Sequence, residues 1–475
     1  MQAKNITSLK ENMSKERETL ASRIGFILLS VGCAVGLGNV WRFPFIVGQY
    51  GGAIFVLLYL ISLVLLGFPV LVMELAIGRA GRLNLVGSYR RLSGGSALWT
   101  NLARLAFLGN VVLMMYYTTV SGWLMAYAKY YLTGSIMECR DNEAFGAFFG
   151  GLVSSPGRVC GYMLLSVFVG TLLCAGSLRN TVERSVKYMM AALFVLMGCL
   201  VIMAFQLPGA REGLRFYLVP NIRSFGSDIV NTIFAAMGQA FFTLSLGVGS
   251  MAIFGSYLDD RNKRSLGRET GHIIFLDTLV ALCAGLIIFP ICSTFGVDVG
   301  QGPSLIFVSL PALFEKLGAG RFWGSLFFIF MAIAALTTIV AVFENMVAYL
   351  IDELHFKRGA AAATVGVGIG ILSLPCALGF NVLSAFKPLG EGTCVLDLED
   401  FIVSQNLLPL GALLSVIFCT VAGGWGWKKF TAEAEEGQKA KYGSVLKIYC
   451  RYVLPLLVIA IFVLGYLQMF TNVLE

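Results

Sequence analysis

The sequence predicts an all-α polytopic membrane protein with eleven transmembrane helices. Of its 475 residues, 57% are hydrophobic and only 13% are charged, and the mean hydropathy is +0.80. Eleven apolar segments, each long enough to cross a bilayer, alternate with polar loops. The first and sixth of these segments are interrupted by glycine and polar residues, which indicates two inverted five-helix repeats followed by one more helix.

The positions of the basic residues predict the orientation of the chain. The net charge is +8, but most Lys and Arg lie in the N-terminal tail and in alternate loops, which is the positive-inside pattern and not a nucleic-acid surface. We therefore expect the N-terminus inside, the C-terminus outside, and the lipid bilayer as the partner. The first apolar segment follows a charged tail and is too long for a cleavable signal peptide.

The predicted elements follow in order from this alternation. Residues 1–22 are a cytoplasmic tail, residues 208–228 an extracellular loop, and residues 425–475 a cytoplasmic loop plus the eleventh span at 447–470. The first repeat, 23–207, contains spans near 24–49, 53–73, 103–132, 160–178 and 188–206. The second repeat, 229–424, contains spans near 229–257, 271–293, 321–351, 362–379 and 400–424. An outer stretch, GPSLIFVSLPALFEKL, predicts a short helical hairpin.

The first span begins as an apolar helix and is interrupted near its middle. Gly32, Gly36 and Gly38 are followed by Asn39 and Arg42. Glycine disfavours helix and lets a ligand approach the backbone closely. A helix that ends halfway across a membrane leaves peptide groups without hydrogen-bond partners. Within a bilayer, such groups occur only where they line a cavity inside the protein. The alternative interpretation is a continuous glycine-rich packing helix.

The sixth span carries a second interruption of the same kind. Gly247 and Gly249 lie beside Gln239, Thr243 and Ser245. Each interrupted segment opens a run of five spans, and because five is odd the second run enters the membrane in the opposite sense. Interrupted helices at corresponding positions of two inverted halves indicate the binding site of a secondary transporter.

The candidate ligands near the two interruptions are all oxygens. They are backbone carbonyls, hydroxyls, one amide and one carboxylate, from Gly32, Ala34, Val35, Asn39, Thr243, Ser245, Asp277, Thr337 and Thr338. Such hard ligands suit an alkali cation and not a transition metal. For the adjacent Thr337 and Thr338, the alternative is that their hydroxyls bond to their own helical turn.

The same region offers donors for an anion. Free N–H groups near Leu37 and Gly38 form a seat for a carboxylate, and Tyr117 adds a phenolic hydroxyl. A carboxylate beside a cation indicates a zwitterionic amino acid. The remaining wall is apolar and predicts an apolar substrate side chain; it consists of Leu37, Leu113, Phe242, Val248 and Val342.

Four motifs in these regions resemble the neurotransmitter:sodium symporter family, especially its bacterial amino-acid transporters with eleven spans. They are GCAVGLGNVWRFPF, YGGAIF, GQAFFTLSLGVGSM and GPSLIFVSLP. The resemblance extends from about residue 17 to the end of the tenth span. It implies the LeuT fold with discontinuous helices one and six, sodium-coupled uptake, and a bacterial cytoplasmic membrane. We expect a monomer or a weak dimer.

The resemblance also implies roles for individual residues. One sodium site is expected at Ala34, Asn39, Thr243 and Asp277, beside the substrate carboxylate, and a second at Gly32, Val35, Ala334, Thr337 and Thr338. Together with the apolar wall, the expected substrate pocket comprises Ala34, Leu37, Gly38, Leu113, Tyr117, Phe242, Thr243, Ser245, Val248, Thr338 and Val342. The expected outer gate is Arg42 with Asp400, above a lid of Tyr117 and Phe242. The expected inner gate is Arg17, Tyr257 and Asp352.

The chain departs from the family pattern at three positions. Leu20 stands where bacterial members commonly have an inner-gate Trp. Ala281 stands where animal members have a chloride-binding Ser and one bacterial member a Glu. Asp277 is the only acid in that span. It is therefore hypothesised to supply both a sodium ligand and the fixed negative charge that chloride would otherwise provide. Transport is then expected to be chloride-independent, with a proton travelling outward on the return step. The alternative is a buried acid paired with a hydroxyl. Val248 stands where some family members have a bulky Phe, which favours a large aliphatic or aromatic substrate.

Two further intramembrane acids, Glu74 and Glu344, are interpreted as structural residues away from the breaks. Each needs a polar partner, because a charge at the bilayer centre is costly.

The predicted function is sodium-coupled symport of a hydrophobic amino acid by alternating access. The alternatives are a transport-dead sensor of the same fold and an ion channel, because broken helices also build selectivity filters. An intramembrane enzyme is disfavoured, since no nucleophile–base pair or metal cluster lies near the breaks in the sequence.

Overall fold

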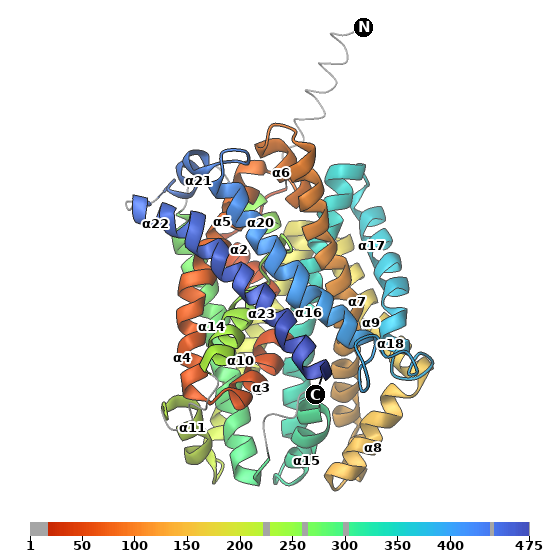
Figure 1. Ribbon diagram of the computed structural model, residues 1–475. Helices are drawn as coiled ribbons and strands as arrows, with labels where there is room; N and C mark the ends of the chain where they lie inside the picture. The colour runs from red at the N-terminus through yellow and green to blue at the C-terminus, as the bar shows by residue number, and fades with distance from the viewer. Residues whose placement is uncertain (1–17, 222–228, 259–264, 298–303, 438–440, 475) are drawn as a thin grey trace.

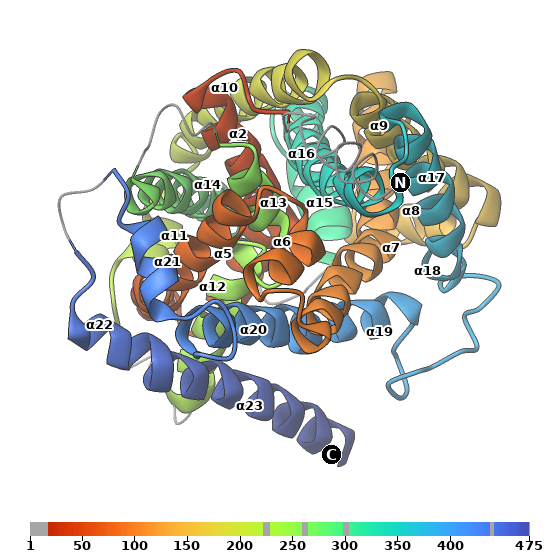
Figure 2. The same cartoon turned by 90° about the horizontal axis from the view of Figure 1, so that it is seen from above.

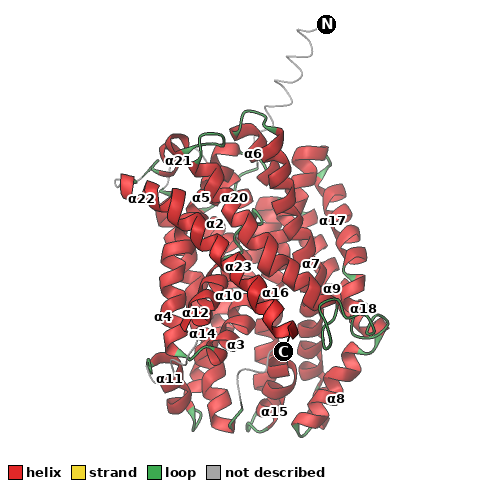
Figure 3. Ribbon diagram, viewed as in Figure 1, coloured by secondary structure: helices red, strands yellow, loops and turns green. Residues whose placement is uncertain are grey.

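A computed structural model describes residues 18–221, 229–258, 265–297, 304–437 and 441–474. All regular secondary structure in these ranges is helical (Figures 1 and 3). Nine helices in them are long and apolar enough to cross a membrane, and a tenth span is a pair bent by 55°. With a second interrupted pair, these helices correspond in order to the eleven predicted spans.

The first five spans are formed by the following helices: α2 (Arg23–Ala34), η1 (Gly38–Arg42) and α3 (Phe43–Gln49); α4 (Ala53–Ser62), η2 (Leu63–Gly67) and α5 (Phe68–Gly81); α7 (Ala97–Thr133); α9 (Pro156–Ala175); η4 (Leu178–Glu183) and α10 (Arg184–Phe205). The next six are α12 (Ile229–Thr243) and α13 (Ser250–Ser256); α14 (Leu266–Phe295); α16 (Gly320–Leu354); α17 (Arg358–Leu372) and α18 (Leu374–Leu378); α19 (Val395–Phe401), η7 (Ile402–Leu407) and α20 (Leu408–Thr420); α22 (Ser444–Ile448), η8 (Tyr449–Val453) and α23 (Leu454–Leu474).

Several helices extend beyond the predicted apolar segments. For example, α7 begins at Ala97, although the predicted third span begins near residue 103. Hydropathy reports where a segment is apolar, whereas a helix continues through polar turns until its hydrogen bonding ends. The span order is therefore predictable from hydropathy, but the helix ends are not.

The loops contain additional short helices: η3 (Ser135–Glu138), α6 (Leu85–Leu92), α8 (Asn142–Val153), α11 (Ala210–Leu218) and α21 (Trp427–Ala434). The side chains of Asn84 and Asp141 cap α6 and α8 by accepting from Gly87 and Ala144 N–H groups. The predicted outer hairpin is wrong in the described residues. There η6 (Leu305–Ser309) runs directly into α15 (Leu310–Glu315), so this stretch forms one short helix and not a hairpin.

The long helix α16 forms the centre of the bundle. It packs against α2, α7, α9, α10 and α17, and most of its apolar middle is buried. Helix α23 instead runs diagonally along the outside (Figures 1 and 2). Helices α6 and α21 lie at one end of the bundle, called here the α6 end, and α8, α11 and α15 lie at the opposite end, called the α8 end (Figure 1).

Candidate functional site

The first predicted interruption is confirmed. Helix α2 ends at Ala34, Val35 has extended backbone with φ −69° and ψ 108°, and helical structure resumes at Gly38. A side-chain carbon at Gly36 would lie 2.4 Å from the Tyr117 hydroxyl and 2.7 Å from that of Thr338. Glycine is therefore required here because α7 and α16 approach the unwound backbone closely.

The second predicted interruption is also confirmed. Residues 244–249 between α12 and α13 are not helical, and Ser245, Gly247 and Gly249 have φ values of 49°, 94° and 79°. A side-chain carbon at Gly247 would lie 2.1 Å from the carbonyl oxygen of Leu408. Left-handed backbone and close packing together explain why glycine stands at this position.

The two interruptions contact each other. The Ser245 hydroxyl donates to the Cys33 carbonyl at 3.3 Å, and the Gln239 amide donates to the Gly38 carbonyl at 2.8 Å. Side chains of the sixth span thus bond to backbone carbonyls on both sides of the first break. The two unwound segments form one polar centre inside an apolar bundle.

The first oxygen cluster surrounds Thr338 on α16. Its buried hydroxyl lies 3.1 Å from the carbonyl oxygen of Val35 and 3.4 Å from those of Gly32 and Ala334. Thr337 donates to the Ala334 carbonyl at 2.9 Å. Both Thr hydroxyls bond within their own helix, as the alternative interpretation expected, but Thr338 also reaches α2. All five oxygens assigned to the second sodium site lie together, and all are uncharged.

The second oxygen cluster surrounds the buried carboxylate of Asp277 on α14. It accepts from the Asn39 amide at 2.8 Å and from the Thr243 hydroxyl at 3.1 Å. Asn39 in turn accepts from the Gly36 N–H at 3.3 Å, and Ala34 ends α2 nearby in the chain. The cluster joins η1, α12 and α14, and unlike the first it contains an acid.

One residue of the predicted substrate wall, Leu37, lies in the first break itself. The Leu37 N–H donates to the Tyr117 hydroxyl at 3.2 Å. Leu113 lies one helical turn before Tyr117, and Val342 one turn after Thr338, so each shares a helix face with a polar site residue. Leu113 and Val342 are both buried.

Val248 is buried and packs closely against α7. A side-chain carbon at Gly109 would lie 2.6 Å from a Val248 methyl group. The Val248 carbonyl accepts from the Asn110 amide at 2.7 Å, and Asn110 accepts from Ser250 and Asn345 at 3.2 and 3.1 Å. Sequence reasoning did not identify Asn110, although an amide in an otherwise apolar span was a signal for it.

The outer gate residues Arg42 and Asp400 are both described by the structure, and they do not form a direct ion pair. The hydroxyl of Ser404 connects them. Arg42 donates to Ser404 at 3.4 Å, and Ser404 donates to Asp400 at 2.8 Å. Tyr116 also donates to Asp400, at 2.9 Å. The Arg42 guanidinium lies 4.2 Å from the centroid of the Phe242 ring. Gate and lid are therefore in contact.

At the inner side, Arg17 lies outside the described residues. The Tyr257 hydroxyl donates to Glu344 at 2.8 Å, and Glu344 forms an ion pair with Arg358. The Leu20 N–H donates to the Tyr257 carbonyl at 3.3 Å. This backbone bond joins the N-terminal segment to the end of α13 without an aromatic ring at position 20.

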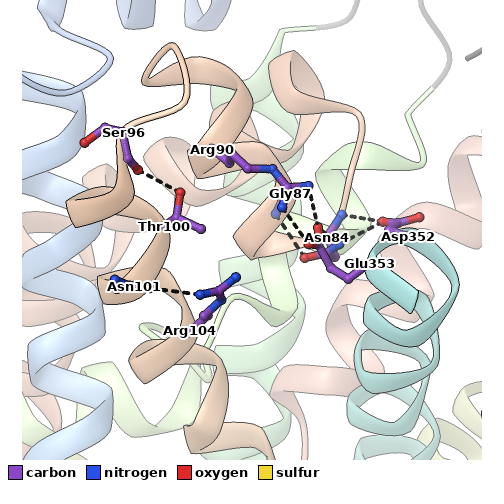
Figure 4. Close-up of polar contacts among 9 residues, drawn as sticks. All are labelled: Asn84, Gly87, Arg90, Ser96, Thr100, Asn101, Arg104, Asp352 and Glu353. Carbon is purple, nitrogen blue, oxygen red and sulfur yellow. Dashed lines mark hydrogen bonds and ion pairs between the residues drawn. The ribbon is translucent and has the colours of Figure 1, made fainter. Parts of the chain in front are cut away.

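Asp352, the third predicted inner-gate residue, binds the loop before α6. It accepts from the backbone N–H and the side-chain amide of Asn84 at 2.6 and 3.2 Å (Figure 4). The adjacent Glu353 forms an ion pair with Arg90 at 2.7 Å (Figure 4). The end of α16 is thereby attached to the α6 end of the bundle.

The interpretation of Glu74 as an acid away from the breaks is wrong. Its buried carboxylate accepts from the Gly247 N–H, inside the second break, at 2.6 Å. Glu344 lies away from the unwound segments, but it belongs to the inner contact with Tyr257. Both acids have the polar partner that burial requires. Glu74 and Gly247 are 173 residues apart, so no local signal connects them.

Comparisons with known proteins agree with this architecture. A model of the sodium:neurotransmitter symporter family matches residues 17–143 and 149–474. An uncharacterised sodium-dependent transporter of Haemophilus influenzae is 33% identical over 95% of this chain and 98% of its own. The uncharacterised sodium-dependent transporter YhdH of Bacillus subtilis is also 33% identical, over a match that covers 93% of this chain and 96% of the relative.

A solved structure has the same fold. The crystal structure of MhsT in complex with L-phenylalanine superposes with a TM-score of 0.84 and 34% identity, covering 94% of this chain and 99% of that one.

Proposed function

The chain belongs to the sodium:neurotransmitter symporter family, and from this membership we propose that it is a sodium-coupled symporter of an amino acid with a large apolar side chain. The observation that carries the proposal is the contact between two unwound helical segments, where side chains of the sixth span donate to backbone carbonyls of the first beside apolar walls.

Two sodium ions are proposed at the two oxygen clusters. The uncharged oxygens around Thr338 are hard ligands on α2 and α16, which suits Na⁺. The cluster around Asp277 adds a carboxylate, and its neighbour Asn39 follows directly on the backbone donors at Leu37 and Gly38. A substrate carboxylate at those donors would complete this site.

The substrate is proposed to be aromatic or large aliphatic. The proposed wall offers the substrate side chain no polar atoms beyond the backbone. It includes Leu37, Leu113, Val248 and Val342. MhsT, similar along nearly its whole length, has been crystallised with L-phenylalanine. A substrate carboxylate near Tyr117 with its side chain along these walls is the arrangement that we propose.

Transport is proposed to be independent of chloride. In this mechanism, Asp277 supplies the fixed negative charge that chloride would otherwise provide, while Ala281 offers no hydroxyl for an anion. We propose that the α6 end faces the cytoplasm and that spans one, two, six and seven tilt against spans three, four, eight and nine. Two sodium ions moving inward would contribute about 4.6 kcal/mol of free energy per 100 mV of membrane potential. This is enough to maintain a roughly thousandfold substrate gradient.

Purified protein tests the proposal in two measurements. Binding of each of the twenty amino acids is measured by scintillation proximity in sodium and in potassium, and uptake is then measured in proteoliposomes with chloride or gluconate outside. We expect saturable binding of apolar amino acids in sodium only, and equal uptake with both anions.

Equal binding in potassium would overturn sodium coupling, and strict chloride dependence would overturn the role of Asp277. Sodium-dependent binding without uptake would favour a sensor.

A further inference from the structure

An apolar groove lies beside the last span and is lined by none of the predicted site residues. It has a volume of about 500 Å³ and is lined by η2, α5, α21, α22 and η8, including Phe68, Met73, Phe430, Leu446 and Cys450. This volume falls in the range of small-molecule sites. Almost all the lining atoms are apolar, so the groove suits a hydrocarbon group.

Specific contacts between its walls hold the groove in shape. The Tyr449 hydroxyl donates to the Leu65 carbonyl in η2 at 2.7 Å, which ties the last span to the second. The Phe430 and Tyr442 rings stack with their centroids 6.3 Å apart. On the membrane side, Val64 is 67% and Val445 83% exposed. The groove is therefore open to the bilayer.

Basic residues stand at the rim of the groove, each next in the chain to a residue that lines it. They are exposed, and none forms an ion pair within the described part of the chain: Lys428, Lys429, Lys441, Lys447 and Arg451. Two acids of this region have protein partners: Glu433 pairs with Arg79, and Glu435 accepts from the Tyr442 N–H at 2.7 Å. An anion at this rim would find uncompensated positive charge.

We propose that this groove binds an anionic phospholipid of the cytoplasmic leaflet. One acyl chain lies along Phe68 and Leu446, and the headgroup phosphate contacts the lysines at the rim. Basic clusters at the cytoplasmic end of a membrane helix recognise anionic headgroups in this way. The proposal uses the proposed orientation of the chain but not its substrate.

The groove also has a direct connection to the polar centre. Met73 lines it, and the next residue, Glu74, binds the second break at Gly247. The ion pair between Arg79 and Glu433 holds α21 against α5. A bound lipid therefore stabilises the helix that supports the unwound segment, and we expect anionic lipid to raise the melting temperature of the purified protein.

Native mass spectrometry of the delipidated full chain tests this proposal. Phosphatidylglycerol and phosphatidylcholine with identical acyl chains are titrated separately. We expect tight retention of phosphatidylglycerol only. The double variant Lys441→Gln/Lys447→Gln should weaken its retention by about twenty-five-fold, about fivefold for each lysine near an anionic headgroup.

Two further variants identify the site. Leu446→Trp fills the groove and should lower phosphatidylglycerol retention while the lysines remain. Lys316→Gln/Lys387→Gln removes two exposed lysines elsewhere and should retain the lipid as the unchanged chain does. Equal retention of both lipids, or equal losses in the two lysine pairs, would overturn the proposal. The readout needs no amino acid or sodium, so it is independent of the proposed transport.

Discussion

At the scale of single residues, the two oxygen clusters differ in charge. Thr338 brings an uncharged hydroxyl to three carbonyl oxygens, whereas Asp277 brings a carboxylate to an amide and a hydroxyl. In a buried site this difference is large, because the electrostatic effect of a charge grows as the local dielectric falls. Each cluster can be tested by a substitution that keeps the shape of the side chain.

We predict that Asp277→Asn raises the sodium concentration for half-maximal amino-acid binding by about tenfold or more, which is about 1.4 kcal/mol. The amide keeps the shape but not the charge. Chloride should partly restore binding in this variant when it replaces gluconate. Asp141→Asn is the control, because Asn caps a helix as well as Asp does. Unchanged sodium dependence in Asp277→Asn would contradict the assignment.

Thr338→Val should also weaken the response to sodium, because it removes the hydroxyl that lies among the carbonyls of α2 and α16. The measurement is again binding as a function of sodium concentration. Thr171→Val is the matched control: among the described residues, that hydroxyl bonds only to the Val167 carbonyl of its own helix, at 2.8 Å. If both variants respond alike, loss of a helix-internal bond explains the effect and the sodium role is wrong.

At the scale of elements, the unwound segments are held by side chains from other helices. Glu74 on α5 accepts from Gly247, Asn110 on α7 donates to Val248, and Gln239 on α12 donates to Gly38. Buried backbone groups need such partners, since each one left unpaired costs about 1–3 kcal/mol. The breaks are therefore stable features of the fold.

Gly247→Ala is predicted to destabilise the protein by about 2–5 kcal/mol, because a side chain meets both left-handed backbone and the Leu408 carbonyl. Thermal unfolding in detergent measures this loss. Gly198→Ala is the control: apart from its chain neighbours and its own helical turn, no atom of the described residues lies within 4 Å of the new side chain, and alanine favours the helix. A stable Gly247→Ala protein would show that the second break does not need its observed backbone.

At the scale of the whole molecule, the inner contacts join parts that are proposed to move apart. Tyr257 follows α13, beside α5, whereas Glu344 and Asp352 lie on the central helix α16. Arg358 continues the connection to α17 and also lies 3.6 Å from Glu18. Transport by alternating access requires that these contacts form and break in each cycle.

Tyr257→Phe removes the hydroxyl that joins α13 to Glu344 and should shift the population towards an inward-open state. Hydrogen exchange should then become faster at the start of α2 and in α13. Tyr188→Phe, at a position 66% exposed on α10, is the control. Unaltered exchange in the Tyr257 variant would mean that this bond does not hold the inner side closed.

The sequence alone predicted the helical class, the order of the spans and the two interruptions. These features depend on local properties, because apolar runs, basic loops and glycine beside polar residues are readable within one segment. It also proposed residues that lie together around Asp277 and Thr338, through resemblance to a family whose motifs the chain retains. Their roles in binding sodium remain predictions.

Other features were decided only by the tertiary structure. Glu74 lies at the second break, Ser404 stands between Arg42 and Asp400, Asn110 holds Val248, and a basic-rimmed groove separates α5 from α22. Each joins residues far apart in the chain, so it depends on how helices pack and not on any local pattern. Hydropathy determines which segments enter the membrane, whereas side-chain packing determines which buried polar groups meet there.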